Sequence, residues 1–119
     1  MTRLAGFVVG FAVLIAAGPT AAHQESPEIL IEDLASPKSR EANGIEKVER
    51  DPHQPRLLVV RVGGGWKKLP VEVRRNRATE WSTRWRRAVP EGITAVLEAG
   101  SDRPIVRFGA HGEVLGVEP

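Results

Sequence analysis

The alternation of hydrophobic and polar residues is clearest in the second half of the chain, where it predicts strands. Residues 56–62 (RLLVVRV) give the strongest signal, because Leu58, Val60 and Val62 share one face and apolar residues also stand between them. This pattern predicts a central strand that is covered on both sides. Shorter apolar runs, joined by glycine-containing turns, predict three further strands at the spacing of an antiparallel meander: residues 93–98, 104–108 and 113–117.

Residues 70–88 have the helical period and predict the main helix. Pro70 suits a first helical turn, and Pro90 with Gly92 ends the helix. The apolar residues fall within one stripe about 100° wide, which predicts the face that packs on the sheet. This stripe contains Val71, Ala78, Trp81, Trp85, Ala88 and Val89.

The N-terminal half is less regular. Residues 45–50 predict an edge strand, since Ile and Val stand among charged residues. Residues 28–34 (EILIEDL) predict a short strand, and residues 35–44 (ASPKSREANG) predict a loop because of their proline and Asn-Gly pair. We therefore expect residues 23–44 to be a flexible acidic lead that includes this short strand.

The order of elements predicts the fold class. One helix between strands can cover one face of a small sheet, which defines a two-layer α+β domain. We expect an antiparallel sheet of four to five strands with the helix of residues 70–88 packed on one face. This domain would span residues 45–119, and the chain is short enough for a single domain.

Residues 1–22 have the three-part layout of a secretory signal peptide. Arg3 precedes an uncharged, mostly apolar run, and Gly18-Pro19 and the small residues 20–22 follow it. We expect cleavage before His23 and a periplasmic or extracellular protein. The alternative is an N-terminal membrane anchor, but the apolar run is shorter than the about 20 residues that span a bilayer.

Composition excludes several kinds of chemistry. The chain has no cysteine and no tyrosine, and it has one methionine. Disulfides, thiolate nucleophiles and cysteine-ligated zinc are therefore excluded. Its fold must depend on core packing.

The formal net charge of +2 conceals a strong partition along the chain. Residues 53–90 contain ten basic and two acidic residues, whereas residues 24–52 contain eight acidic and four basic ones. Residues 91–119 are also acidic on balance. Either the acidic segments fold over the basic one and neutralise it, or the basic segment faces an anionic partner.

The arginines of the predicted main helix are the candidate anion-binding or partner-binding residues. A helical wheel places Arg74 inside the apolar stripe, and it places Arg77 and Arg84 within cation–π reach of Trp81. The tryptophans would form the core, with the arginines solvated or self-paired, or the arginines would bind an anionic protein, glycan or membrane surface. Nucleic acid is disfavoured by the nearly neutral balance and the predicted export. The candidate residues are Arg74, Arg75, Arg77, Arg84, Arg86 and Arg87.

Two further motifs suggest weaker hypotheses. Residues 63–65 (GGG) lie between a strand and a helix, as phosphate-binding loops do, but they lack the G-x-x-x-x-G-K-[ST] spacing. They more simply permit a sharp turn, with Trp66 capping the core. After cleavage, the amine and imidazole of His23 could bind copper, with His53 or His111 as a further nitrogen ligand.

Catalytic patterns are weak. No serine stands in G-x-S-x-G or S-x-x-K, Asp51 and His53 have no nucleophile near them in sequence, and Glu32-Asp33 are typical of a solvated acidic edge. The sequence therefore favours an exported, non-enzymatic binding or accessory protein with a basic Arg/Trp helix. The alternatives are a small periplasmic copper-binding protein that uses His23 and an enzyme of unknown class.

Overall fold

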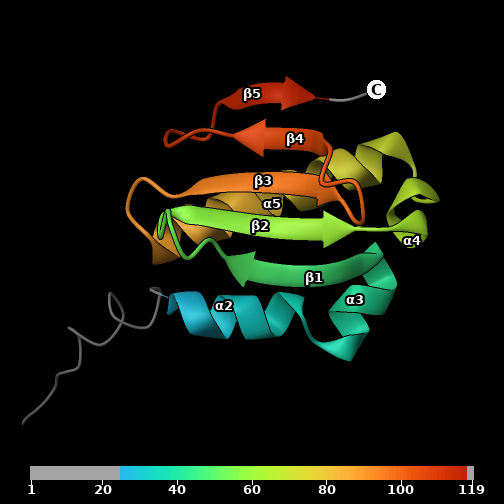
Figure 1. Ribbon diagram of the computed structural model, residues 1–119, viewed down its shortest axis with the longest axis horizontal. Helices are drawn as coiled ribbons and strands as arrows, with labels where there is room; N and C mark the ends of the chain where they lie inside the picture. Colours follow the sequence, from blue (N-terminus) through green and yellow to red (C-terminus); the bar gives the residue numbers. More distant parts are fainter. Residues whose placement is uncertain (1–24, 118–119) are drawn as a thin grey trace, which may run out of the picture.

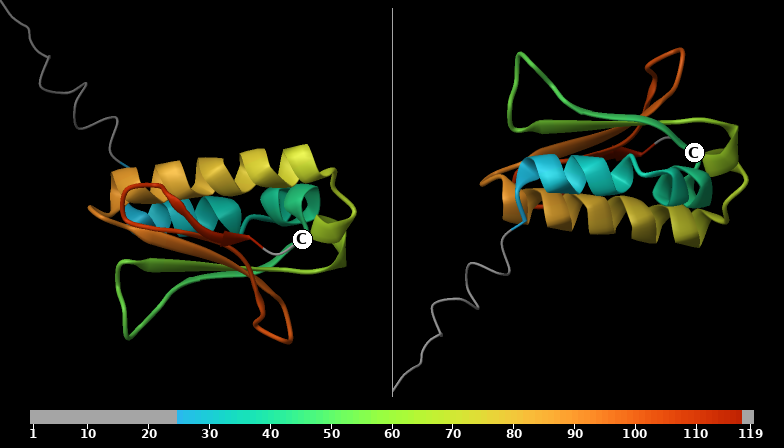
Figure 2. Two further views of the ribbon diagram at one scale, coloured as in Figure 1. Left: turned by 90° about the horizontal axis from the view of Figure 1, so that it is seen from above. Right: turned by 90° about the horizontal axis from the view of Figure 1, so that it is seen from below.

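The computed structural model describes residues 25–117, which fold into a five-stranded mixed sheet with strand order β1-β2-β3-β4-β5 (Figure 1). The helices of this part of the chain all lie on one face of the sheet (Figure 2). The predicted two-layer α+β class is therefore confirmed. The elements are α2 (Pro27–Leu34), α3 (Pro37–Asn43), β1 (Ile45–Arg50), β2 (Leu57–Val62), α4 (Gly64–Lys67), α5 (Val71–Ala88), β3 (Ile93–Glu98), β4 (Pro104–Phe108) and β5 (Val114–Val117).

The sheet is mixed rather than fully antiparallel, which corrects one part of the prediction. β2 and β3 pair in parallel, from Leu57 opposite Ile93 to Val62 opposite Glu98. Between them α5 carries the chain back along the sheet, so both strands run in the same direction. The edge position of β1 and the antiparallel β3-β4-β5 meander agree with the prediction.

The predicted strand and loop before β1 are helices instead. α2 begins at Ser26, whose Oγ accepts a hydrogen bond from the Ile29 amide at 3.1 Å. α3 begins in the same way at Ser36, whose Oγ accepts from the Ser39 amide at 3.2 Å. A proline follows each serine, and proline suits a first helical turn because it has no amide proton to leave unsatisfied there.

α3 ends against the short helix α4. Gly44 is its C-cap and has a φ of 69°, in the left-handed region that glycine adopts without strain. A Cβ atom built on Gly44 would lie 2.1 Å from the backbone nitrogen of Trp66. The two backbones therefore approach each other as closely as a glycine permits.

The core lies between the sheet and the helices, and the tryptophans occupy its centre. Trp85 is 0% exposed, Trp81 2% and Trp66 1%. The ring centroids of Trp66 and Trp81 are 5.3 Å apart. α2 contributes Leu30 and Leu34, which are also buried. The prediction that the tryptophans form the core is confirmed, and Trp66, predicted to cap the core, is itself buried in it.

The opposite face of β2, predicted to be covered as well, faces away from the helices (Figure 2). Ion pairs cross this face. Arg61 Nε donates to Asp102 Oδ1 at 2.9 Å, and the same guanidinium pairs with Glu49. The hydrogen bond from Arg61 is the main cause that lowers the pKa of Glu49.

None of the helices within residues 25–117 combines the length and the apolar character needed to cross a membrane. The predicted signal peptide, residues 1–22, lies outside the described residues.

Glu98, at the end of β3, links the sheet to α4. It pairs with Lys67, it accepts a hydrogen bond from Ser101 Oγ at 2.7 Å, and Arg103 Nε lies 3.8 Å away. These contacts, the Lys67 hydrogen bond first, lower the pKa of Glu98 from 4.5 to about 2. The carboxylate form is therefore favoured by folding.

This shift predicts an acid-sensitive contribution to stability. A carboxyl group whose pKa is lowered in the folded state stabilises it fully above pH 4.5, and this contribution is lost as the pH falls to about 2. Glu98→Gln should therefore be less stable than the parent at pH 7, and the two melting temperatures should converge as the pH approaches 2. Thermal melts between pH 7 and 2 check this, with Glu41→Gln, an exposed carboxylate on α3, as the control for removing one negative charge. A difference that is constant across this range would contradict it.

Candidate anion-binding site

Four of the six arginines of α5 lie on two opposite sides of the helix. Arg77 and Arg84 are seven residues apart, close to two turns, so they share one side. Arg75 and Arg86 are eleven residues apart, close to three turns, and share the other. These two sides have different neighbours in the fold.

Arg77 and Arg84 face the N-terminal helices and are engaged there. Arg84 Nη1 lies 2.9 Å from Asp33 Oδ2, and Arg84 also forms a two-pronged pair with Glu25. The hydrogen bond to Glu25, followed by that to Asp33, raises the pKa of Arg84 against the effect of its burial. Arg77 Nη1 donates to Asn43 Oδ1 at 2.5 Å. These two arginines tie α5 to α2 and α3.

The cation–π contact found in the described residues differs from the predicted one. The Arg50 guanidinium lies over the Trp85 ring, 5.6 Å from its centroid. Arg77 and Arg84, which the sequence placed beside Trp81, extend instead to polar partners on α2 and α3. Oppositely charged and amide partners from distant segments therefore decide where these side chains point.

Other cations of the basic segment are paired with the acidic segments on either side. Arg56 Nη1 lies 3.1 Å from Glu91 Oε1, Lys67 pairs with Glu98, and Arg61 bridges two acids. The acidic segments thus neutralise part of the basic one. The exposed or half-buried cations of α5 left without a hydrogen bond or ion pair to residues 25–117 include Arg74, Arg75 and Arg87.

Arg86 lies beside the turn between β4 and β5. A Cβ atom on Gly112 would come within 2.6 Å of Arg86 Nη2, and the buried Nε of Arg86 has no hydrogen-bond partner in the described residues. Backbone amides, including that of His111 at 2.9 Å, lower the pKa of Glu113, and the charges of His111 and Arg86 add smaller effects. Arg87 is exposed on the outer side of α5.

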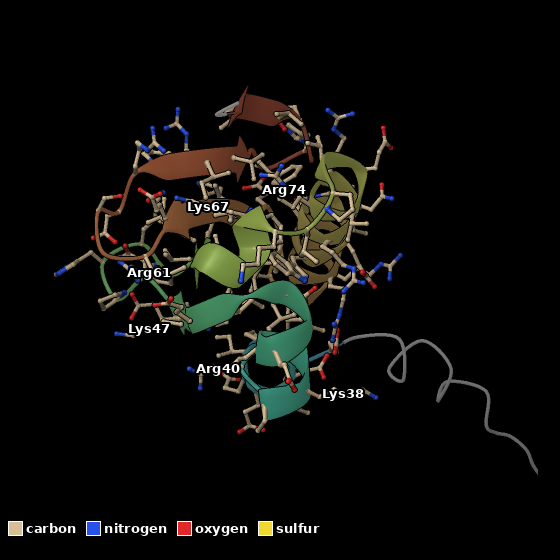
Figure 3. All side chains as sticks on the ribbon, turned by 90° about the vertical axis from the view of Figure 1, so that its right-hand side faces the viewer. Lys38, Arg40, Lys47, Arg61, Lys67 and Arg74 are labelled. Atoms are coloured by element: carbon tan, nitrogen blue, oxygen red, sulfur yellow. The ribbon has the colours of Figure 1, made fainter. Side chains whose placement is uncertain are left out.

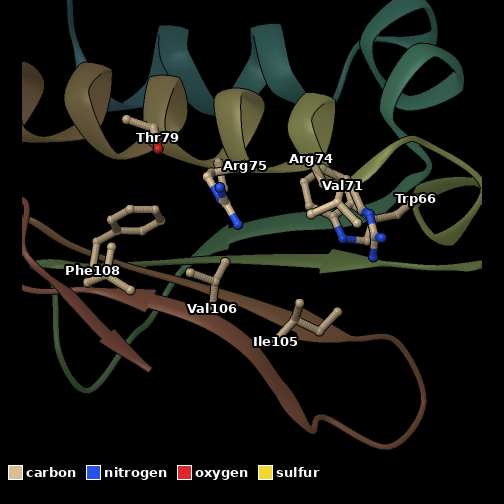
Figure 4. A pocket seen from close by; sticks show the side chains of 10 residues that line it. Trp66, Val71, Arg74, Arg75, Thr79, Ile105, Val106 and Phe108 are labelled. Carbon is tan, nitrogen blue, oxygen red and sulfur yellow. The ribbon is translucent and has the colours of Figure 1, made fainter. Parts of the chain in front are cut away.

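A pocket of about 260 Å³ lies between the N-terminal half of α5 and strands β4 and β5 (Figure 4). Figure 4 shows the Arg74 and Arg75 side chains extending from α5 toward the sheet, with Val106 and Phe108 on the strand side. The pocket is lined by Trp66, Val71, Arg74, Arg75, Ala78, Thr79, Ile105, Val106, Phe108 and Val114.

The walls of this pocket are apolar, and its charged groups are cations alone. Seven of the lining residues are aliphatic or aromatic, and none is acidic. Arg74 Nε and Trp66 Nε1 are both buried and lack a hydrogen-bond partner within residues 25–117. At the rim, Val71 and Val114 are each 56% exposed. The pocket therefore combines positive charge with accessible apolar surface, beside two buried N–H donors that have no partner in the described residues.

Seen from the end of the molecule that carries α4, Arg74 lies in the same region as Lys67 (Figure 3). Lys67 is engaged by Glu98, whereas Arg74 extends into the pocket. The wheel position of Arg74 inside the apolar stripe was the sequence signal for this arrangement. The strand side of the pocket had no such signal, since Ile105, Val106 and Phe108 form an ordinary strand pattern.

The other candidate residues have structural surroundings of their own. Asp51 Oδ1 accepts hydrogen bonds from the amides of His53 at 2.7 Å and Gln54 at 3.0 Å, and this shapes the β1-β2 turn. His53 and His111 are both exposed in turns. No group of three or more His, Cys, Asp or Glu residues that could hold a metal occurs within residues 25–117. His23 lies outside the described residues, so its copper site stays a prediction.

By its fold and pocket, the protein is a small two-layer α+β protein with an apolar pocket that arginines border on one side. Comparison with protein-family models, with curated proteins and with solved structures found no match to this chain. The function is therefore inferred from the residues of the site itself.

Proposed function

We propose that the protein is a small, exported, non-enzymatic binding protein that takes an anionic partner on the β4-β5 side of α5. The observation that carries this proposal is the division of the α5 arginines. Arg77 and Arg84 have partners on α2 and α3, whereas Arg74 and Arg75 have none among the described residues and border an apolar pocket. Export is inferred from the signal-like residues 1–22.

The division changes which arginines matter for binding. An arginine that is already paired with a carboxylate has little charge to offer a partner. Arg84 therefore stabilises the fold and does not contribute to binding. Arg75 is exposed at the pocket and free to contact an anionic protein, glycan or membrane surface. Exposed apolar residues beside it, such as Val71 and Val114, add surface that such a contact can bury.

Binding to an anionic surface tests the proposal. The chain from His23 onward, which includes all described residues, is mixed at low ionic strength with phosphatidylglycerol vesicles and, as a neutral comparison, with phosphatidylcholine vesicles. We expect cosedimentation with the anionic vesicles alone and a loss of binding as salt is added. A soluble acidic glycan, added as competitor, separates a preference for glycan from one for lipid.

A matched pair of reversals locates the surface. Arg75→Glu changes the charge by two, and at ~1 kcal/mol per charge it should weaken vesicle binding roughly thirtyfold. Arg87→Glu makes the same change in net charge on the outer side of α5 and should have a much smaller effect. Equal effects of the two reversals, or no binding by the parent protein at low salt, would refute the proposed surface.

A further inference from the structure

We infer that the pocket between α5 and strands β4 and β5 binds a small organic acid, a carboxylate on a short apolar body. This inference deepens the proposed function, since it identifies the ligand class of the same side of α5. It depends on the apolar walls of the pocket and on the buried N–H donors beside it, which the proposal of an anionic partner does not require.

The apolar walls of the pocket indicate that the ligand has an apolar part. Residues from both layers, including Ala78 on α5 and Val106 and Phe108 on β4, are buried around the pocket. Its volume of about 260 Å³ is slightly below the ~300–1,000 Å³ typical of pockets for drug-sized ligands. A short chain or one small ring therefore fits, and a longer chain would project past Val71 and Val114 at the rim.

The donors specify the acid group. A guanidinium presents N–H groups in a planar fork that matches the two oxygens of a carboxylate. Arg74 Nε and Trp66 Nε1 are buried without a partner in residues 25–117, and Trp66 is only 1% exposed. A buried donor without an acceptor is unfavourable, so an oxygen-rich group that reaches these atoms is stabilised by them.

Both features are needed to explain the pocket. An inorganic anion would leave the apolar walls in contact with water, and a neutral apolar molecule would leave the two buried donors unpaired. No carboxylate lines the pocket, and Glu113, which precedes the lining residue Val114, accepts backbone hydrogen bonds. An amphipathic acid satisfies the walls and the donors together.

Three probes separate these contributions: octanoate, 1-octanol and acetate. Each is titrated into the chain from His23 onward by isothermal calorimetry, at one pH and salt concentration. We expect octanoate to bind at least tenfold more tightly than either 1-octanol, which lacks the charge, or acetate, which lacks the chain. Octyl phosphate, used as a fourth probe, shows whether the site prefers a carboxylate to a phosphate head group.

Two pairs of variants place the binding in the pocket. Arg74→Met keeps the length of the side chain but removes the charge and its donors, and it should weaken octanoate binding about tenfold or more. Arg87→Met removes the same charge outside the pocket and should leave binding unchanged. Val71→Glu adds a carboxylate at the rim and should also weaken binding, whereas Ile29→Glu, at an equally exposed position on α2, should not. Circular dichroism confirms that each variant is folded.

Several results would overturn the inference. Equal affinity for octanoate and 1-octanol would show that the site does not recognise the acid group. Unchanged octanoate binding in both Arg74→Met and Val71→Glu would show that octanoate does not bind in the pocket. If the protein binds anionic vesicles but not octanoate, the proposed function stands and this inference is wrong. If it binds octanoate but not anionic vesicles, this inference stands and the proposed surface is wrong.

Discussion

Trp85→Ala is expected to destabilise the protein by about 3–5 kcal/mol, a large part of the ~5–15 kcal/mol that holds a typical small domain folded. The indole is fully buried, and its Nε1 donates to the Arg56 carbonyl oxygen at 2.8 Å. A Cβ atom on Gly92 would come within 2.6 Å of the same ring, so the surrounding residues already fit closely around it. Removal would leave a cavity at the centre of the core.

Urea unfolding followed by circular dichroism measures this loss. Trp85→Phe is the comparison, because it retains an aromatic ring but loses the hydrogen bond, and it should cost less than the alanine variant. Trp81→Ala, at a position that is 2% exposed, should be destabilised to a similar extent as Trp85→Ala. Unfolding curves of both alanine variants that coincide with that of the parent would show that these side chains are not core.

Gly44→Ala should also be strongly destabilising, although it adds only one methyl group. The left-handed backbone at this position costs an L-residue roughly 1–2 kcal/mol. The added Cβ would also lie 2.1 Å from the Trp66 nitrogen, and a backbone atom cannot rotate away as a flexible side chain can. We expect the melting temperature to fall by about 10 °C or more.

Gly64→Ala provides a matched control in the same part of the fold. A Cβ atom there meets nothing within 4 Å, and its φ is not positive. This variant should therefore differ from the parent by less than about 1 kcal/mol, with any change toward higher stability because alanine restricts the unfolded chain. Similar melting temperatures for the two alanine variants would contradict the close approach of the Gly44 and Trp66 backbones.

The elements with strong local signals were predictable from sequence. α5 begins after Pro70 and ends before Pro90, and β3 and β4 have the predicted boundaries. α2 was missed because its isoleucines favour strands, although Leu30 and Leu34 are four residues apart, as one face of a helix requires. The better signal was the serine before each of Pro27 and Pro37.

The candidate site was predictable only in part. The wheel placed Arg74 among apolar side chains, and the pocket contains it. The partners of Arg77 and Arg84 come from residues 34 and 59 positions away, and no local pattern reports such pairs. The pocket depends on how closely α5 approaches β4 and β5, which follows from the packing of the tryptophans rather than from any motif.

The parallel pairing of β2 and β3 has a consequence for the order in which the fold can assemble. The β1-β2 hairpin and the β3-β4-β5 meander join neighbouring segments, whereas the central pairing must first close the loop of residues 63–92. Closing a loop of this length costs about 3 kcal/mol of chain entropy before any contact compensates it. We therefore expect the parallel pairing of β2 with β3 to form more slowly than the two antiparallel units. This pairing depends on α5, which brings β3 back beside β2.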